Sequence, residues 1–189
     1  MYKRQDELLK KALRYKGYWG SKGGITVSGG EPLLQMDFLT EFFKKAKAEG
    51  VHTNLDTSGN PFTDQEPWHS GWLELMKYTD LVMLDIKQID EQEHIKLTGH
   101  SNKNILAMAR ELSDMKKPVW IRHVLVPDGS DKDEYLHRLA DFIHTLSNVE
   151  RVEVLPYHTL GKFKWENLGL SYPLELSLIH ISEPTRLGM

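Results

Sequence analysis

A glycine-rich turn with an acid and a proline is the first stretch of this sequence that could do chemistry. It reads GGEP at residues 29–32 and follows the β-branched run ITV at 25–27. Glycines permit positive φ angles and close approach of a ligand to the backbone, and Glu31 supplies a carboxylate acceptor. The turn matches neither a Gly-x-Gly-x-x-Gly nor a Walker-type loop. The acid disfavours a phosphate, so we expect a ligand with a positively charged amino group; a tight turn that binds nothing is the alternative.

Four further polar clusters lie at or near the ends of strand-like segments. They are Asp56-Thr57-Ser58-Gly59, Asp85-Ile86-Lys87, Arg122-His123 and Pro156-Tyr157-His158. Each alone has a structural explanation, because Asp-Thr-Ser-Gly is a common turn or helix cap, a lysine near an aspartate is usually its ion-pair partner, and a terminal histidine is often solvated. Five polar strand ends at one edge are harder to explain in this way. Ligands bind at the carboxyl ends of parallel strands, so we expect a binding site there.

The elements that must position these residues alternate regularly between strand and helix. The expected strands are 24–28, 51–56, 80–87, 118–127 and 149–158, and the expected helices are 6–18, 36–49, 66–78, 104–115 and 131–146. The segment DLVMLDIK at 80–87 is almost continuously apolar, which is typical of a strand covered on both faces. Alternation with short connections predicts an α/β fold with a parallel sheet and helices outside it.

Composition limits the classes of function that remain. The chain has 189 residues, of which 40% are hydrophobic and 27% are charged, and its formal net charge is -3. No basic excess is available to neutralise phosphates, so we expect no nucleic-acid partner. No apolar run approaches the length of a membrane span and no signal peptide is evident, so we expect no membrane partner and a cytoplasmic location. Cysteine is absent, which excludes disulfides and thiolate metal sites built from this chain alone.

The two ends of the chain differ in character from its interior. Residues 176–189 contain LSLIHISEPTR, which resembles a translated sequencing adapter, and MYKRQ at 1–5 resembles its reverse complement. We therefore interpret 6–175 as one evolved domain and 1–5 and 176–189 as non-native tails. On this interpretation, 6–175 is an internal fragment of a longer protein.

Several motifs together resemble one family, and the resemblance covers essentially all of 6–175. They are ITVSGGEPLLQ, HTNLDTSG, DLVMLDIK, WIRHVLVPDGSD and LPYHTLGKFKWENLG. In order and spacing they resemble the pyruvate formate-lyase activating enzymes, which are radical S-adenosylmethionine enzymes that install a glycyl radical. The GGEP motif is shared by many radical S-adenosylmethionine enzymes, and the last motif is far more specific. The resemblance implies a partial (β/α)6 TIM-like barrel, here without its first strand and cluster-binding loop.

The resemblance also implies roles for individual residues. It places the cofactor S-adenosylmethionine against Gly29, Gly30, Glu31, Asp56, Asp85, Ile86, Lys87 and His158. In charge terms, Glu31 and Asp56 suit the ammonium group and Lys87 suits the carboxylate. A monovalent cation is implied near Asp56, Thr57 and Asp85. We expect the side chains at the strand ends to converge on one rim, with Asp56 and Asp85 on adjacent strands, Lys87 close to one of them and His158 across the cavity.

The family's chemistry needs parts that this chain does not contain. Its [4Fe-4S] cluster is held by a Cys-x3-Cys-x2-Cys motif, and this chain has no cysteine, so we expect no catalytic residue here and an inactive chain. The partners that the family implies are pyruvate formate-lyase as protein substrate and a flavodoxin or ferredoxin as electron donor, with a monomeric enzyme. Two alternatives remain open, namely an activator of another glycyl radical enzyme and a non-catalytic βα binding module.

Overall fold

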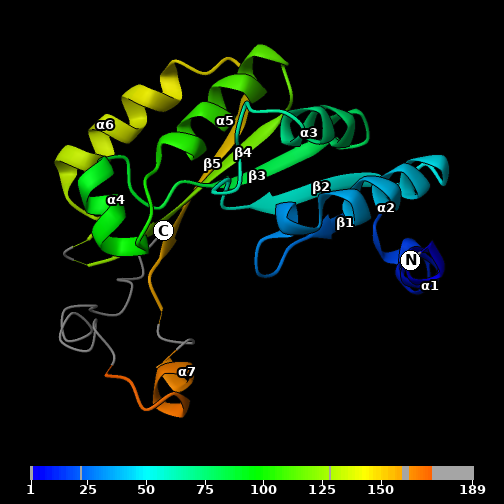
Figure 1. The fold of residues 1–189 in the computed structure, drawn as a ribbon, viewed down its shortest axis with the longest axis horizontal. Coiled ribbons are helices and arrows are strands. Elements are labelled where there is room, and N and C mark those ends of the chain that lie inside the picture. The colour runs from blue at the N-terminus through cyan, green and yellow to red at the C-terminus, as the bar shows by residue number, and fades with distance from the viewer. Residues whose placement is uncertain (1, 22, 128, 159–161, 172–189) are drawn as a thin grey trace, which may run out of the picture.

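A parallel sheet of five strands forms the centre of the molecule (Figure 1). The computed structural model describes residues 2–21, 23–127, 129–158 and 162–171. The strands lie side by side in the order in which they occur in the sequence. They are β1 (Gly24–Val27), β2 (His52–Thr57), β3 (Leu81–Asp85), β4 (Val119–Leu125) and β5 (Val149–Pro156). All four neighbouring pairs are parallel, so the carboxyl ends of the strands meet along one edge.

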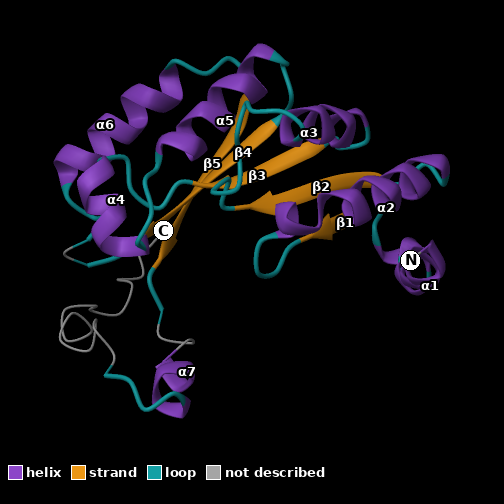
Figure 2. Cartoon of the chain, viewed as in Figure 1, coloured by secondary structure: helices purple, strands orange, loops and turns teal. Residues whose placement is uncertain are grey.

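Helices in the connections cover one face of this sheet (Figure 2). The helices are α1 (Tyr2–Leu13), α2 (Met36–Ala48), α3 (Trp68–Lys77), α4 (Glu91–Thr98), α5 (Lys103–Asp114), α6 (Asp133–His144) and α7 (Lys162–Asn167), with short 3-10 turns at Lys16–Tyr18 and Pro32–Gln35. The apolar stripes of α2, α3, α5 and α6 pack with the strands into a single core. Phe43, Trp72 and Met108 are fully buried in it.

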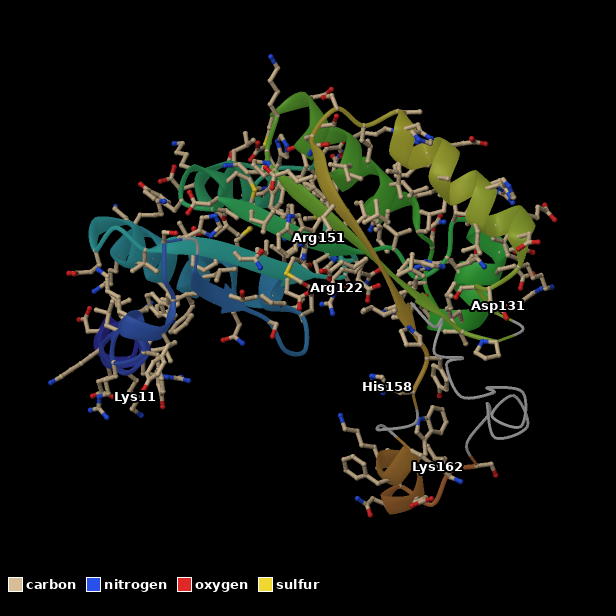
Figure 3. The ribbon with its side chains drawn as sticks, turned by 180° about the vertical axis from the view of Figure 1, so that it is seen from behind. Lys11, Arg122, Asp131, Arg151, His158 and Lys162 are labelled. Carbon is tan, nitrogen blue, oxygen red and sulfur yellow. The ribbon has the colours of Figure 1, made fainter. Side chains whose placement is uncertain are left out.

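The alternation of side chains along each strand separates a core face from an open face. On and just after β3, Val82, Leu84 and Ile86 are fully buried in the core, whereas the side chain of Asp85 alternates to the other side of the sheet. We call that other side the open face. In the described part of the chain no helix covers it, as the reverse view shows (Figure 3). Lys87 follows the strand at its carboxyl end, where it lines a pocket with Ser58, Thr98 and Ile105. The open face and the carboxyl edge together define where a ligand can reach the strand ends.

The predicted parallel α/β fold is confirmed, whereas one predicted helix needs correction and two helices were not predicted. The first helix ends at Leu13, not at residue 18, and a 3-10 turn follows. Helix α4 was not expected, although Asp90 caps it by accepting hydrogen bonds from the backbone of Gln92 and Glu93 at 3.0 and 3.1 Å. Gly99, with φ of +80°, ends it. The short α7 was not expected either.

The structure describes the amino-terminal end of the chain but not the predicted carboxyl-terminal tail. Helix α1 begins at Tyr2, and the side chain of Gln5 is only 2% exposed, so this end continues directly into α1. The predicted tail at 176–189 lies outside the described residues. Among the helices that the structure describes, none is long and apolar enough to cross a membrane.

Candidate functional site

The turn after β1 has the backbone that its glycines predict. Gly29 and Gly30 have φ angles of +93° and +52°, in the region that side chains disfavour, so this expectation is confirmed. A Cβ atom added at either glycine would meet nothing within 4 Å. The requirement for glycine in this structure is therefore conformational, and open space lies around the turn.

The carboxylate of Glu31 is engaged by its own chain. It accepts hydrogen bonds from the Thr57 hydroxyl at 2.6 Å and from the Leu33 backbone N–H at 3.1 Å. It also accepts from both the hydroxyl and the backbone N–H of Ser58, at 2.6 and 3.0 Å. Four donors use most of the lone pairs of a carboxylate. Glu31 thus fastens the turn after β1 to the end of β2, and its contact with a ligand ammonium stays a prediction.

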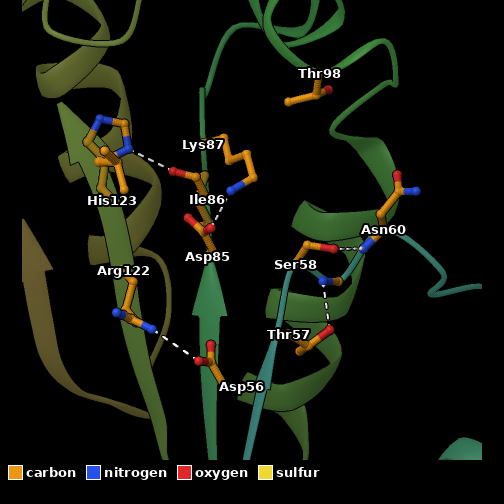
Figure 4. Close-up of polar contacts among 12 residues, drawn as sticks. Asp56, Thr57, Ser58, Asn60, Asp85, Ile86, Lys87, Thr98, Arg122 and His123 are labelled. Carbon is orange, nitrogen blue, oxygen red and sulfur yellow. Dashed lines mark hydrogen bonds and ion pairs between the residues drawn. The ribbon is translucent and has the colours of Figure 1, made fainter. Parts of the chain in front are cut away.

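The Asp85–Lys87 pair lies at the end of β3. Lys87 Nζ lies 2.5 Å from Asp85 Oδ2, and the two side chains are 41% and 24% exposed (Figure 4). The other carboxylate oxygen, Oδ1, is enclosed and has no hydrogen-bond partner in the described part of the chain. Ile86 between them is fully buried and faces the core. The pair therefore combines a half-exposed ammonium group with a carboxylate that can accept more hydrogen bonds.

Asp56 lies on the neighbouring strand and is paired with an arginine that the sequence analysis left unassigned. Arg122 on β4 donates to Asp56 Oδ2 at 3.1 Å, reaching across β3 (Figure 4). Its Nε lies 3.7 Å from Glu153 on β5. In the sequence, the only sign of a role for Arg122 was its position near the end of a predicted strand. The open face thus carries acids and bases from four adjacent strands.

The expected cation ligands do not all face the same way. Thr57 is 3% exposed, and its hydroxyl donates to Glu31 and accepts from the Gly59 backbone, whereas Asp56 and Asp85 are on the open face. Among the described residues no group of three His, Cys, Asp or Glu side chains is arranged to hold a metal ion. The cation site near Asp56, Thr57 and Asp85 stays a prediction.

His158 lies at the far end of the candidate site. It is exposed and follows the end of β5, on the segment that leads toward α7 (Figure 3). Its expected position across the cavity from Lys87 stays a prediction. Gly30, Glu31, Asp56, Asp85 and Lys87 share one edge of the sheet, and His158 extends that edge along β5.

Comparison with known proteins shows the family to which this chain belongs. The model of the radical SAM superfamily matches residues 1–142. A pyruvate formate-lyase-activating enzyme of Streptococcus mutans is 56% identical over 169 residues, covering 89% of this chain and 64% of that protein. One from Staphylococcus epidermidis is 57% identical over 171 residues, covering 90% and 68%. This chain belongs to the family of pyruvate formate-lyase-activating enzymes. It spans about two thirds of the length of these relatives.

Solved structures agree with the assignment to the pyruvate formate-lyase-activating enzymes. A domain of such an enzyme from Bacteroides vulgatus superimposes with a TM-score of 0.63 and 25% identity, covering 78% of this chain and 96% of that one. SuiB of Streptococcus suis, solved with S-adenosylmethionine bound, gives 0.60 with 15% identity over 84% of this chain and 39% of its own, which shows the fold alone. The five parallel strands correspond to part of the TIM-like barrel of this family.

The residues present fit one of the two groups that the family uses. Opposite charges at neighbouring strand ends, with an unpartnered carboxylate oxygen on Asp85, suit a zwitterionic amino acid such as the methionine part of S-adenosylmethionine. The iron–sulfur cluster has no fit here, because it needs thiolate ligands and this sequence contains no cysteine.

Proposed function

We propose that this chain is the S-adenosylmethionine-binding portion of an enzyme that activates pyruvate formate-lyase. The observation that carries the proposal is the Asp85–Lys87 pair at the carboxyl end of β3, beside Asp56 on the next strand. It presents both signs of charge at the edge of the sheet where α/β folds bind ligands. The names of the curated relatives support the choice of pyruvate formate-lyase as the protein substrate.

The proposed roles follow from the charge of each side chain and from how far its own hydrogen bonds leave it able to bind a ligand. Lys87 binds the carboxylate of the methionine part, because its ammonium is half-exposed and held by one aspartate oxygen. The ammonium of the methionine part lies toward the Asp85 carboxylate, Asp56 and the backbone of the Gly29–Gly30 turn. Glu31 positions that turn through its four hydrogen bonds. His158 contacts a more distant part of the cofactor from the end of β5.

When bound in the whole enzyme, the cofactor would supply the radical that abstracts a hydrogen atom from a glycine of the partner protein. A [4Fe-4S] cluster with ligands outside this chain, and a flavodoxin or ferredoxin as electron donor, complete the proposal.

We also propose that the enzyme is a cytoplasmic monomer, and that 6–175 is the evolved domain between two non-native tails. This chain alone binds the cofactor without turning it over.

Equilibrium dialysis of the full chain against S-adenosylmethionine tests the proposal. Lys87→Met should weaken binding about ten-fold, since a charge-assisted hydrogen bond is lost. Lys77→Met is the matched control, because Lys77 is also ion-paired, at 2.6 Å from Glu74, but lies on α3. It should leave binding unchanged. Failure of the unaltered chain to bind, or equal affinities for the Lys87→Met and Lys77→Met variants, would overturn the proposal.

A further inference from the structure

We propose that His123 is a positioning residue for the carboxylate-binding end of this site. Its ring lies on the core side of the sheet and holds the carbonyl group of Ile86, so that the side chains of Asp85 and Lys87 on either side of Ile86 face the ligand. The inference deepens the proposed function and rests on it for the identity of the ligand. In the sequence, His123 stands near the end of a strand, and no motif marks it for a role.

The geometry around Ile86 carries the inference. His123 is 2% exposed, and its Nδ1 lies 2.7 Å from the carbonyl oxygen of Ile86 (Figure 4). Both ring nitrogens face carbonyl oxygens, which only accept, and a neutral ring carries one proton. The shorter contact, 2.7 Å for Nδ1 against 3.3 Å for Nε2, assigns that proton to Nδ1. The backbone N–H of Ile86 donates to the carbonyl of Arg122 at 2.9 Å. Both backbone groups of Ile86 are thereby fixed to β4, and its side chain is fixed in the core.

Buried polar contacts extend this arrangement into the loop after β4. The Nε2 atom of His123 lies 3.3 Å from the carbonyl oxygen of Ser130. The hydroxyl of Ser130 donates to the carbonyl of Val124 at 2.5 Å and accepts from the N–H of Val126 at 2.9 Å. Gln88, also fully buried, donates to the carbonyl of Gly129 at 2.8 Å. The loops after β3 and β4 are therefore held together away from solvent.

Lys87 depends on this support because it lies beyond the ladder of β3. The strand ends at Asp85, so Ile86 is the last residue that β4 holds before Lys87. Removing the donor of His123 leaves a buried carbonyl without a partner, and the peptide is then free to turn. Lys87 would lose its fixed direction while the fold remained. The arrangement explains why a polar ring occupies a fully packed position.

The test compares two ligands that differ at the end of the molecule that Lys87 is proposed to bind. S-adenosylmethionine carries the amino and carboxylate groups, and 5′-methylthioadenosine lacks both. For the full chain, His123→Leu should lower the affinity for S-adenosylmethionine about ten-fold and that for 5′-methylthioadenosine less than two-fold. His123→Gln should restore most of the affinity, because its amide N–H can donate to Ile86.

A control and two ligand-independent measurements complete the test. Thr79→Val removes a buried hydroxyl that donates to the Leu75 carbonyl at 3.0 Å, remote from the site, and should change neither affinity. Amide hydrogen exchange over 86–90 should accelerate in His123→Leu and stay slow in Thr79→Val. In the unaltered chain, ¹⁵N spectra of the ring should show a proton on Nδ1 of His123.

The outcomes separate the two proposals. Equal losses for both ligands, unchanged exchange over 86–90, or an unprotonated Nδ1 would each overturn the positioning role of His123. If the unaltered chain binds neither ligand, the proposed function fails, and the exchange and ¹⁵N measurements still decide whether His123 holds the segment. If His123→Leu does not fold, His123→Gln and the ring spectrum give the decision.

Discussion

The two ends of the sheet both carry an aspartate with a lysine, and they differ in how completely those groups are bonded. At the amino end, Asp80 accepts from Lys47 with both oxygens at 2.8 Å, and from the backbone N–H and hydroxyl of Thr53 at 2.9 and 3.2 Å. At the carboxyl end, Asp85 is bonded to Lys87 through one oxygen, and its other oxygen is unpartnered among the described residues.

The difference indicates which polar clusters are structural and which can bind a ligand. A carboxylate that accepts four hydrogen bonds from its own chain has little left to offer, whereas an unpartnered oxygen beside a half-exposed ammonium can still bind. By this criterion Glu31 resembles Asp80 more than it resembles Asp85, although it lies at the carboxyl edge. The following predictions test the criterion, from the largest expected change in the free energy of unfolding to the smallest.

Asp80→Ala should cause the largest loss. It leaves Lys47 and the N–H of Thr53 without their acceptor, and the free energy of unfolding should fall by about 2–3 kcal/mol. Urea unfolding of the full chain measures it. The control is Asp6→Ala, which removes an exposed aspartate paired with Lys45 and should cost less than about 0.5 kcal/mol. Equal losses in the two variants would show that the bonding of Asp80 adds nothing.

Glu31→Gln should cause the second-largest loss, about 1–2 kcal/mol in the free energy of unfolding, because charge-assisted hydrogen bonds are replaced by neutral ones. Glu7→Gln on the exposed side of α1 is the control and should be neutral. The same variants should be tested for binding of S-adenosylmethionine. A large loss of affinity with no loss of stability would place Glu31 with Asp85 as a ligand contact and break the comparison.

Acid should remove the contribution of Asp80 selectively. Burial raises the pKa of Asp80, but the hydrogen bonds from Lys47 and the Thr53 N–H outweigh it, so the pKa lies below its usual value of 3.8. A lowered pKa in the folded state stabilises the fold above pH 3.8, and this stabilisation is lost as the pH falls through the folded-state pKa. The stability difference between the unaltered chain and Asp80→Asn should therefore shrink below pH 4 in urea titrations. A constant difference down to pH 2 would contradict it.

Lys87→Met should change the free energy of unfolding least, by less than about 0.5 kcal/mol, because a half-exposed ion pair contributes little to stability. Urea unfolding of the same variant used for the binding experiment provides the value. Lys47→Met, at the amino end of the sheet, is the variant for comparison. It should lower the free energy of unfolding more than Lys87→Met does. A loss above about 1 kcal/mol for Lys87→Met would make this lysine structural, as Lys47 is.

Much of the fold could be predicted because its signals are local. The apolar run before Asp85 and the β-branched run before Gly29 marked two strands, and alternation with helices marked a parallel sheet. Helix α4 was missed because its apolar periodicity is weak. The signals for it were instead the cap at Asp90 and the glycine at Gly99.

The sequence predicted which edge of the sheet carries the site, but not how the side chains at that edge contact one another. Sequence placed Asp56, Asp85 and Lys87 at one edge, because parallel strands end together. It could not show that Thr57 faces Glu31, since that depends on which face each residue of β2 takes. Nor could it show that Arg122 reaches across β3 to Asp56, since nothing local in either segment encodes the other.

The strictly sequential order of the strands has a consequence for how the chain is made. Each strand pairs with the one that precedes it in the sequence, so no strand must wait for a later one to fill a gap beside it. A chain emerging from the ribosome can thus add β2 to β1, then β3 to β2, and bury each new helix as it appears. The strand order therefore permits folding in the direction of translation, with each new strand added at the edge that the preceding strand forms.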